Sequence, residues 1–264
     1  MKRILTLSLL LLFSLGFVKA QENNNYPFQN GERVDFVISY AWGGVITDVA
    51  SMNLKTLYEN GEYKVTMTAG TYRFFDLFFK IRESLETKFS EETLRPSFFH
   101  REALEGKYRM KNTLTFNPSD NTIKSRTQKY DRVPYDTLLR GTEKTKDLLT
   151  LFFFYRTVDF TNAPVGEKVP MEFVVDKEIY SLYFIFKGRE KKHIPGVGTF
   201  NTMKFMVKVV TGNVFEGKED MCLWVSDDKN KVPLYFEAQL KFGKVQGHAT
   251  KLSGTKYPLT AKIK

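Results

Sequence analysis

Apolar and polar residues alternate along most of the chain with a period of two residues, which is typical of β-strands. The longest example runs from Val232 to Phe242, where every second residue is apolar. Alternation of the same kind recurs over 34–42, 50–54, 63–69, 77–89, 96–100, 108–116, 123–130, 171–175, 179–187, 203–209 and 221–225. The pattern predicts an all-β protein of mostly antiparallel strands, folded as a barrel or as a sandwich.

Polar segments between these stretches predict turns. Asn60-Gly61 lies between two alternating stretches, and both central residues of a tight hairpin turn need a positive φ, which Asn and Gly adopt readily. The segment 117–121 consists of residues that favour turns or break strands. The segment 227–231 lacks the glycine and the final glutamate of a calcium-binding loop, so we interpret it as a further turn.

Residues 145–156 predict the one helix. Thr145 is placed to cap it, and Asp147 falls in the first turn, where the helix dipole favours an acid. The residues that follow are apolar nearly all round, so the helix must be buried, for example as a plug in a sheet or barrel. No repeat or linker divides the chain, which predicts one β-rich domain over 31–264 after a polar, disordered lead-in at 21–30.

The first twenty residues have the pattern of a cleavable signal peptide. Two basic residues precede an apolar stretch over 4–17, and small or apolar residues at 18 and 20 predict cleavage after Ala20. The stretch is shorter than the roughly 20 residues of a membrane-spanning helix. The next residue is Gln21 rather than the cysteine of a bacterial lipoprotein. We therefore expect a periplasmic or secreted protein that does not span the membrane after cleavage.

The net charge limits the range of possible partners, and the cysteine content limits the possible disulfides. The formal net charge is +10, and removing the signal peptide takes away three basic residues and no acidic ones, which leaves +7. Such a protein could bind anionic lipid, lipopolysaccharide or polysaccharide, or an envelope protein, whereas export and the lack of a concentrated basic run argue against nucleic acid. Cys222 is the single cysteine, so no intramolecular disulfide is possible.

Residues for nucleophilic catalysis are sparse. The three histidines are His100, His193 and His248. His193 could pair with a serine, and His248 could pair with Cys222, but the chain has no Gly-x-Ser-x-Gly nucleophile motif. We expect these histidines to have structural or solvent-facing positions.

Other catalytic and cofactor motifs are also weak. One cysteine and three scattered histidines do not supply a zinc site. The carboxylate pairs that glycoside cleavage would need are Glu83 with Glu86, or Glu219 with Asp220, and the sequence does not place either pair in space. The glycines of 196–198 do not open a helix after a strand, so they predict a turn rather than a phosphate loop. The sequence thus predicts no catalytic, metal or cofactor site and no enzyme, and it leaves the ligand-binding residues unassigned.

The aromatic content allows two interpretations. The chain has 24 phenylalanines, which could line an apolar cavity for a lipid or acyl chain, or could simply fill a large β-core. Trp42, Trp224 and Tyr235 could likewise stack on a sugar ring or pack in the core. The sequence does not decide whether the interior is hollow.

Short motifs in a fixed order resemble those of the domain-of-unknown-function 3108 (DUF3108) family of exported bacterial proteins. They are Phe28–Glu32, Asp147–Leu149, Phe154–Arg156, Gly196–Phe200, Leu223–Asp228 and Val232-Pro233. The resemblance covers nearly all of the chain after the signal peptide. It implies a mostly antiparallel barrel-like or sandwich-like fold in single-domain envelope proteins, and it implies no established activity.

Together these features predict an exported protein that binds an envelope component, lipid or polysaccharide, without catalysis. A structural or interaction protein of an envelope assembly machine is the alternative, and a hydrolase of envelope polymers is a third possibility. A transmembrane barrel would also show alternating strands of about ten residues. The buried helix, the positive charge and a basic rather than aromatic end at 262–264 argue against it.

Overall fold

A computed structural model of the chain describes residues 26–207 and 221–263. The predicted signal peptide, residues 1–20, lies outside the described residues. The described residues form strands β1 Arg33–Trp42, β2 Val45–Glu59, β3 Glu62–Thr71, β4 Ile81–Ser90, β5 Pro96–Glu105, β6 Tyr108–Asn117, β7 Thr122–Lys129, β8 Tyr135–Arg140, β9 Lys168–Val175, β10 Glu178–Ile194, β11 Gly198–Val207, β12 Met221–Ser226, β13 Pro233–Gln239 and β14 Lys244–Ser253, with helix α1 Leu148–Thr157 and the 3₁₀ turn η1 Phe75–Leu77. The prediction of a mostly antiparallel all-β fold with one buried helix is confirmed.

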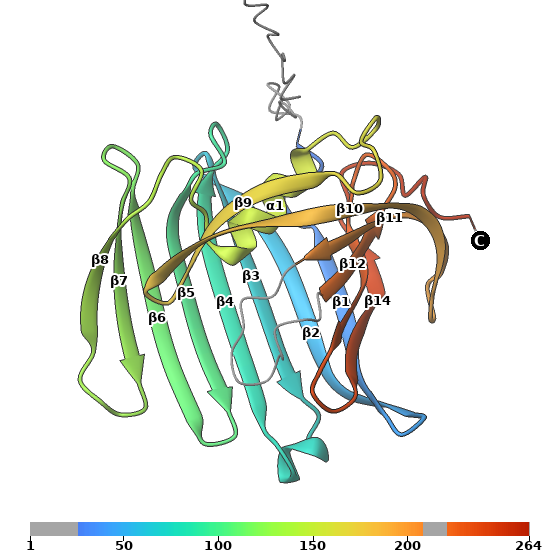
Figure 1. Cartoon of the computed structure of the whole chain (residues 1–264), viewed down its shortest axis with the longest axis horizontal. Coiled ribbons are helices and arrows are strands. Elements are labelled where there is room, and N and C mark those ends of the chain that lie inside the picture. The colour runs from blue at the N-terminus through green and yellow to red at the C-terminus, as the bar shows by residue number, and fades with distance from the viewer. Residues whose placement is uncertain (1–25, 208–220, 264) are drawn as a thin grey trace, which may run out of the picture.

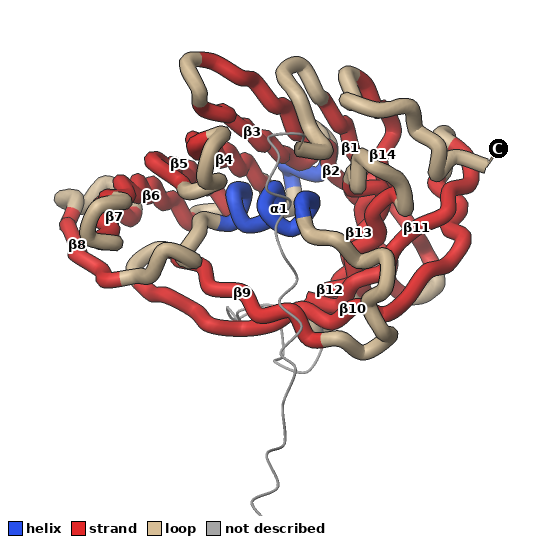
Figure 2. The backbone as a smooth tube through the Cα atoms, turned by 90° about the horizontal axis from the view of Figure 1, so that it is seen from above, coloured by secondary structure: helices blue, strands red, loops and turns tan. Residues whose placement is uncertain are grey.

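The strands form one 14-stranded sheet built from two meanders. One meander runs from β8 to β1 and the other from β14 to β9, and the antiparallel pairing of β1 with β14 joins them. Figure 1 shows the first meander as a broad, curved wall. Seen from above, β9 and β10 cross in front of that wall, and α1 lies between the two halves (Figure 2). The result is a barrel-like sheet whose outermost strands are β8 and β9.

The predicted Asn60-Gly61 hairpin is confirmed. Both residues have positive φ, 52° and 81°, and Glu59 pairs with Glu62 across the turn. Such a turn has a twist that matches the twist of the two strands it joins. The local sequence therefore sets the register of β2 against β3.

Two strand predictions extend too far at one end of the sheet. Residues 77–80 belong to the connection between β3 and β4, where Asp76 accepts a hydrogen bond from Thr71 and forms an ion pair with Arg82. Residues 240–243 form the turn between β13 and β14. The alternation of apolar residues continues through both turns, but their apolar side chains point to solvent, so the pattern alone misplaced the strand ends.

Helix α1 begins later than predicted. Its N-cap is Asp147, whose Oδ1 accepts hydrogen bonds from the backbone N–H groups of Leu149 and Thr150 at 3.0 Å each. Thr145, which was predicted to cap the helix, instead donates its hydroxyl to Glu172 on β9. The carboxylate of Asp147 reaches two unsatisfied N–H groups of the first turn, which explains why the helix begins after it.

The segment before β1 is part of the core. Tyr26 and Phe28 are buried, and the Phe28 ring lies 4.8 Å from the ring of Phe153 on α1. The prediction of a disordered lead-in is therefore wrong for residues 26–30, because their aromatic rings pack between the helix and the wall. In the part of the chain that the structure describes, no helix is both long and apolar enough to cross a membrane.

Candidate functional site

An apolar cavity of about 290 Å³ lies beside α1. The helix contributes side chains from one face, and strands β9 to β12 contribute the opposite wall. Its apolar lining residues are Leu148, Leu151, Phe152, Tyr155, Phe160, Met171, Phe184, Met203, Phe205, Val207, Met221, Leu223 and Val225. A lining of this composition favours an apolar ligand, because it offers few hydrogen-bonding groups. Phe152, Phe160, Phe184 and Phe205 line this cavity, whereas Phe28, Phe89, Phe153, Phe186 and Phe200 are fully buried in the core, so the phenylalanines serve both uses that the sequence allowed.

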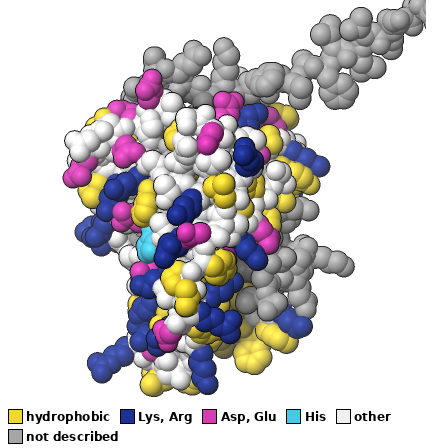
Figure 3. Space-filling model, turned by 90° about the vertical axis from the view of Figure 1, so that its left-hand side faces the viewer, with side chains coloured by type: hydrophobic (Ala, Val, Ile, Leu, Met, Phe, Trp, Pro, Cys, Tyr) yellow, Lys and Arg dark blue, Asp and Glu magenta, His cyan; other side chains and the backbone are white. Residues whose placement is uncertain are grey.

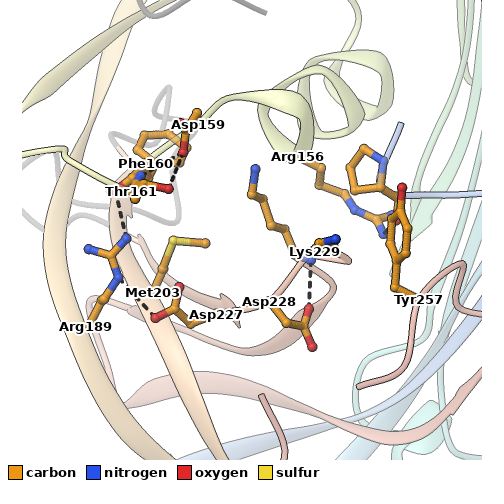
Figure 4. Close-up of a pocket in the computed structure, with 12 residues that line it drawn as sticks. Arg156, Asp159, Phe160, Thr161, Arg189, Met203, Asp227, Asp228, Lys229 and Tyr257 are labelled. Carbon is orange, nitrogen blue, oxygen red and sulfur yellow. Dashed lines mark hydrogen bonds and ion pairs between the residues drawn. The ribbon is translucent and has the colours of Figure 1, made fainter. Parts of the chain in front are cut away.

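A charged pocket of about 410 Å³ adjoins the cavity. Arg156, Phe160, Met203 and Lys231 line both spaces. The other residues that line the charged pocket are Pro27, Asp159, Thr161, Arg189, Asp227, Asp228, Lys229 and Tyr257 (Figure 4). We call the two adjoining spaces together the cavity site, and we refer to the charged pocket as its entrance.

Arg156 lines the charged pocket and connects several of the segments around it. Its guanidinium forms a buried ion pair with Glu32, with N–O distances of 2.6 and 2.9 Å, and it donates to the backbone carbonyl of Asn230 at 2.9 Å. The guanidinium also lies over the rings of Phe28 and Phe153, at 5.4 and 5.1 Å from their centroids. A planar guanidinium suits such several-sided binding. Because Glu32 neutralises its charge, Arg156 positions the site rather than attracting a ligand.

The turn between β12 and β13 places two lysines at the entrance. Asp228 accepts hydrogen bonds from the Ser226 hydroxyl at 2.8 Å and from the Asn230 backbone N–H at 2.9 Å. These local bonds confirm the predicted turn at 227–231. Lys229 and Lys231 emerge from it and line the charged pocket.

Lys231 connects the two spaces. Its Nζ donates to the carbonyl of Val158 at 2.6 Å, and burial lowers the pKa of its ammonium group. On the opposite side of the pocket Arg189 is engaged by Asp227 at 3.1 Å and by the carbonyl of Phe160 at 2.8 Å. Arg189 and Lys231 are thus held in place by the protein. The carboxylates of Asp159, Asp227 and Asp228 line the same pocket, so its lining carries charges of both signs.

The structure does not bring the histidine candidates into a catalytic arrangement. His100 Nδ1 lies 2.8 Å from the hydroxyl of Thr113, and His193 Nδ1 lies 3.3 Å from that of Thr199. Both are contacts across neighbouring strands. His248 on β14 and Cys222 on β12 are separated by β13.

The carboxylate candidates are also apart. Glu83 points to the face of β4 that carries its buried residues, and it forms an ion pair there with Arg101. Burial raises the pKa of Glu83. Glu86 lies three residues further along the same strand, so it points to the other face, where Lys64 binds it at 3.0 Å. Glu219 and Asp220 fall outside the described residues. The Glu83–Glu86 pair therefore does not form.

The remaining candidates have structural positions. Gly196 and Gly198 belong to the hairpin between β10 and β11, as predicted. Trp224 and Tyr235 pack edge to face at 5.1 Å in the core, whereas Trp42 is 66% exposed at a strand end. Among residues 26–207 and 221–263, no group of three or more His, Cys, Asp or Glu side chains could hold a metal ion.

The sequence did not reveal the cavity site. The signal was present in two motifs, because Phe154–Arg156 and Leu223–Asp228 both contribute side chains to it. Their convergence depends on the curl that brings β9 to β12 across the helix, and no local pattern encodes that curl.

The fold and site define a class of protein, the barrel-like antiparallel sheet that encloses a helix and a cavity. A solved structure with a similar fold, titled a β-barrel-like protein of the domain of unknown function DUF1849 from Brucella abortus, matches with a TM-score of 0.57 and 8% sequence identity, covering 87% of this chain and 99% of that one. The family model described as a protein of unknown function (DUF3108) matches residues 35–250, and this chain belongs to that family. A search of curated proteins finds no match to the chain.

Proposed function

We propose that this protein is an exported, non-catalytic binding protein for an amphiphile of the bacterial envelope. The observation that carries the proposal is the cavity site, in which an apolar space of about 290 Å³ shares four residues with a charged pocket. An acyl chain would fill the apolar space, and a polar headgroup would lie in the charged pocket, beside Lys229 and Lys231 and the carboxylates of Asp159, Asp227 and Asp228. The signal-like residues 1–20 support export.

The shape of the site favours a lipid over a polysaccharide. Sugar-binding sites need several polar groups that match hydroxyls, together with an exposed aromatic platform. The cavity instead presents Leu, Val, Met and Phe side chains, and the hydroxyl of Tyr155 is already bonded to the carbonyl of Pro170. Its lining therefore suits hydrocarbon.

The proposal predicts that filling the cavity abolishes amphiphile binding. Leu223 lines the cavity and is partly buried, so Leu223→Trp should place an indole where the acyl chain would lie. We expect a fluorescent fatty acid to bind the delipidated wild-type protein and to bind the variant at least tenfold more weakly, measured by titration.

The matched control is Leu57→Trp, which makes the same change at a residue that is 46% exposed on β2 and outside the cavity. This control should bind the probe like the wild type. Wild-type protein that binds no fatty acid, and yields no lipid on solvent extraction, would refute the proposal.

A further inference from the structure

A second feature lies at the end of the strands shown at the bottom of Figure 1. It consists of the connections β1–β2, β3–β4, β5–β6, β7–β8 and β13–β14. We call this surface the loop rim and define it as residues 42–46, 72–80, 106–107, 130–134 and 240–243. None of these residues lines the cavity site.

Hydrogen bonds connect neighbouring parts of the loop rim. Tyr40, at the end of β1, donates its hydroxyl to the carbonyl of Phe242 at 2.7 Å. The backbone N–H of Gly106 donates to the carbonyl of Lys80 at 2.8 Å. The first bond ties the β13–β14 connection to β1, and the second ties the β5–β6 connection to the β3–β4 connection.

Large apolar side chains of the loop rim are exposed to solvent. The exposed fractions are 66% for Trp42, 64% for Val45, 62% for Ile46, 64% for Phe74, 80% for Leu77, 74% for Phe78, 53% for Phe79, 87% for Val133 and 67% for Phe242. Burying such side chains in a partner would remove much apolar surface from water. Exposed apolar surface of this extent marks an interaction site.

The loop rim is also basic. Its basic residues are Arg73, Lys80, Lys107, Arg132 and Lys241, and its acidic residues are Asp76 and Asp131. Asp76 is already bound by Arg82 at 2.6 Å. Basic and apolar side chains gather in the lower part of the face shown in Figure 3. Exposed apolar groups combined with positive charge favour a partner that has anionic groups at its surface and an apolar layer beneath them.

The opposite ends of the same strands have the reverse character. The connections there are 60–61, 91–95, 118–121 and 141–145, and they expose no large apolar side chain. Their charged residues are Glu91, Glu92, Asp120 and Glu143 with Arg95 and Lys144. Other large apolar side chains, such as Leu138 and Val165, are exposed elsewhere, but the loop rim carries many of them together, whereas these opposite connections carry none.

We propose that the loop rim docks the protein on an anionic lipid surface. The aromatic and aliphatic side chains would enter the boundary between headgroups and acyl chains, and the Arg and Lys side chains would lie against lipid phosphates. Aromatic side chains favour this boundary, and projections from five separate connections suit a broad fluid surface better than a single peptide. This proposal rests on residues separate from the cavity site and stands independently of the proposed function.

Vesicle binding by the purified protein tests the proposal. We expect the protein to sediment with vesicles of phosphatidylglycerol and phosphatidylcholine, more weakly with phosphatidylcholine alone, and less as salt is added. The triple variant Phe74→Ser, Leu77→Ser, Phe78→Ser should bind the mixed vesicles at least tenfold more weakly. These side chains are exposed, so the variant should keep the wild-type circular dichroism spectrum and melting temperature.

Matched controls separate docking from general stickiness. Val165→Ser changes a side chain that is 71% exposed before β9, outside the loop rim, and should bind vesicles like the wild type. Leu223→Trp should also bind like the wild type, which keeps this test distinct from that of the cavity site.

Trp42 supplies a direct readout. It lies on the loop rim, whereas Trp224, the other tryptophan of the chain, is 2% exposed in the core. The fluorescence emission of the protein should shift to shorter wavelength on vesicle addition, and Trp42→Phe should abolish the shift but not the sedimentation.

Equal vesicle binding by the wild type and the triple variant would overturn the proposal, as would no binding by the wild type. A dimer in sedimentation velocity that the triple variant dissociates would assign the loop rim to a second copy of the chain and would also overturn it.

Discussion

At the scale of single residues, the buried charges hold the halves of the molecule together. The Arg156–Glu32 pair links α1 to the segment before β1, and through Asn230 it reaches the turn beside the entrance of the cavity site. Burying two charges is costly in itself, so the pair matters most for what its loss would leave behind. It explains why motifs far apart in the sequence act as one structural unit.

Removing one charge of this pair should destabilise the fold strongly. Glu32→Gln leaves the Arg156 guanidinium buried without a counter-charge, and we expect the free energy of unfolding to fall by about 3 to 5 kcal/mol in urea denaturation. Lys111→Gln breaks the exposed ion pair with Glu102 and should cost less than about 1 kcal/mol. Equal effects of the two substitutions would contradict the role given to the buried pair.

Lys146 should make stability depend on pH. Burial lowers its pKa to about 8, below the roughly 10.4 of an unfolded lysine. Between these pH values the unfolded state binds more protons, so the free energy of unfolding should rise with pH by at most about 1.4 kcal/mol per pH unit. Below about pH 8 both states are protonated, and this contribution is constant.

Lys146→Met should remove that rise and stabilise the protein at pH 7, as measured by urea denaturation at pH 7 and pH 9.5. Lys144→Met, at an exposed position two residues away, should keep the pH dependence of the wild type. A wild-type profile in Lys146→Met would show that Lys146 is not the group that titrates.

At the scale of elements, α1 is fixed at both ends. Asp147 caps its first turn and also accepts hydrogen bonds from the hydroxyls of Thr87 at 2.8 Å and Thr150 at 2.6 Å. Arg156 anchors the last turn. A short helix surrounded by strands needs such anchors, because its own sequence supplies little stability in isolation.

Loss of the cap should loosen the helix. Asp147→Ala removes acceptors from two N–H groups and two buried hydroxyls, and we expect a loss of about 2 to 4 kcal/mol in urea denaturation. Asp120→Ala removes a comparable bond to the N–H of Thr122 at an exposed turn and should cost less than about 1 kcal/mol. The comparison uses the unfolding midpoints of the two variants. Similar midpoints for the two variants would show that the cap does not hold the helix.

Elements with a complete local signal were predictable from sequence, and others were not. The conformations of Asn60-Gly61 and of the turn at 227–231 are determined by the residues of the turns themselves. Strand β14 was not predicted because Gly247 interrupts its pattern, and the structure explains the glycine, since a Cβ there would lie 2.3 Å from the Phe236 ring. The cap was misplaced because Thr145 and Asp147 are both good capping residues, and only the contact of Thr145 with β9 decides between them.

At the scale of the whole molecule, the sequence predicted the class of fold but left barrel and sandwich open. The curl of a single sheet across α1 resolves this choice and creates the cavity site. The volume of the cavity is the space left unfilled when the side chains of α1 and of β9 to β12 pack together. That space depends on segments far apart in the chain, so no single stretch of sequence predicts it. The exposed Phe74 and Leu77 were hidden for a related reason, because apolar residues usually indicate a core.

The pairing of β1 with β14 has a consequence for how the protein is made. The two strands lie at opposite ends of the chain, yet they form the seam that unites the meanders. During synthesis the first meander can assemble early, but its β1 edge stays open until the final strand emerges. Open edges invite pairing with other chains. Until β14 emerges, the growing polypeptide therefore carries an unpaired β1 edge that can associate with other chains.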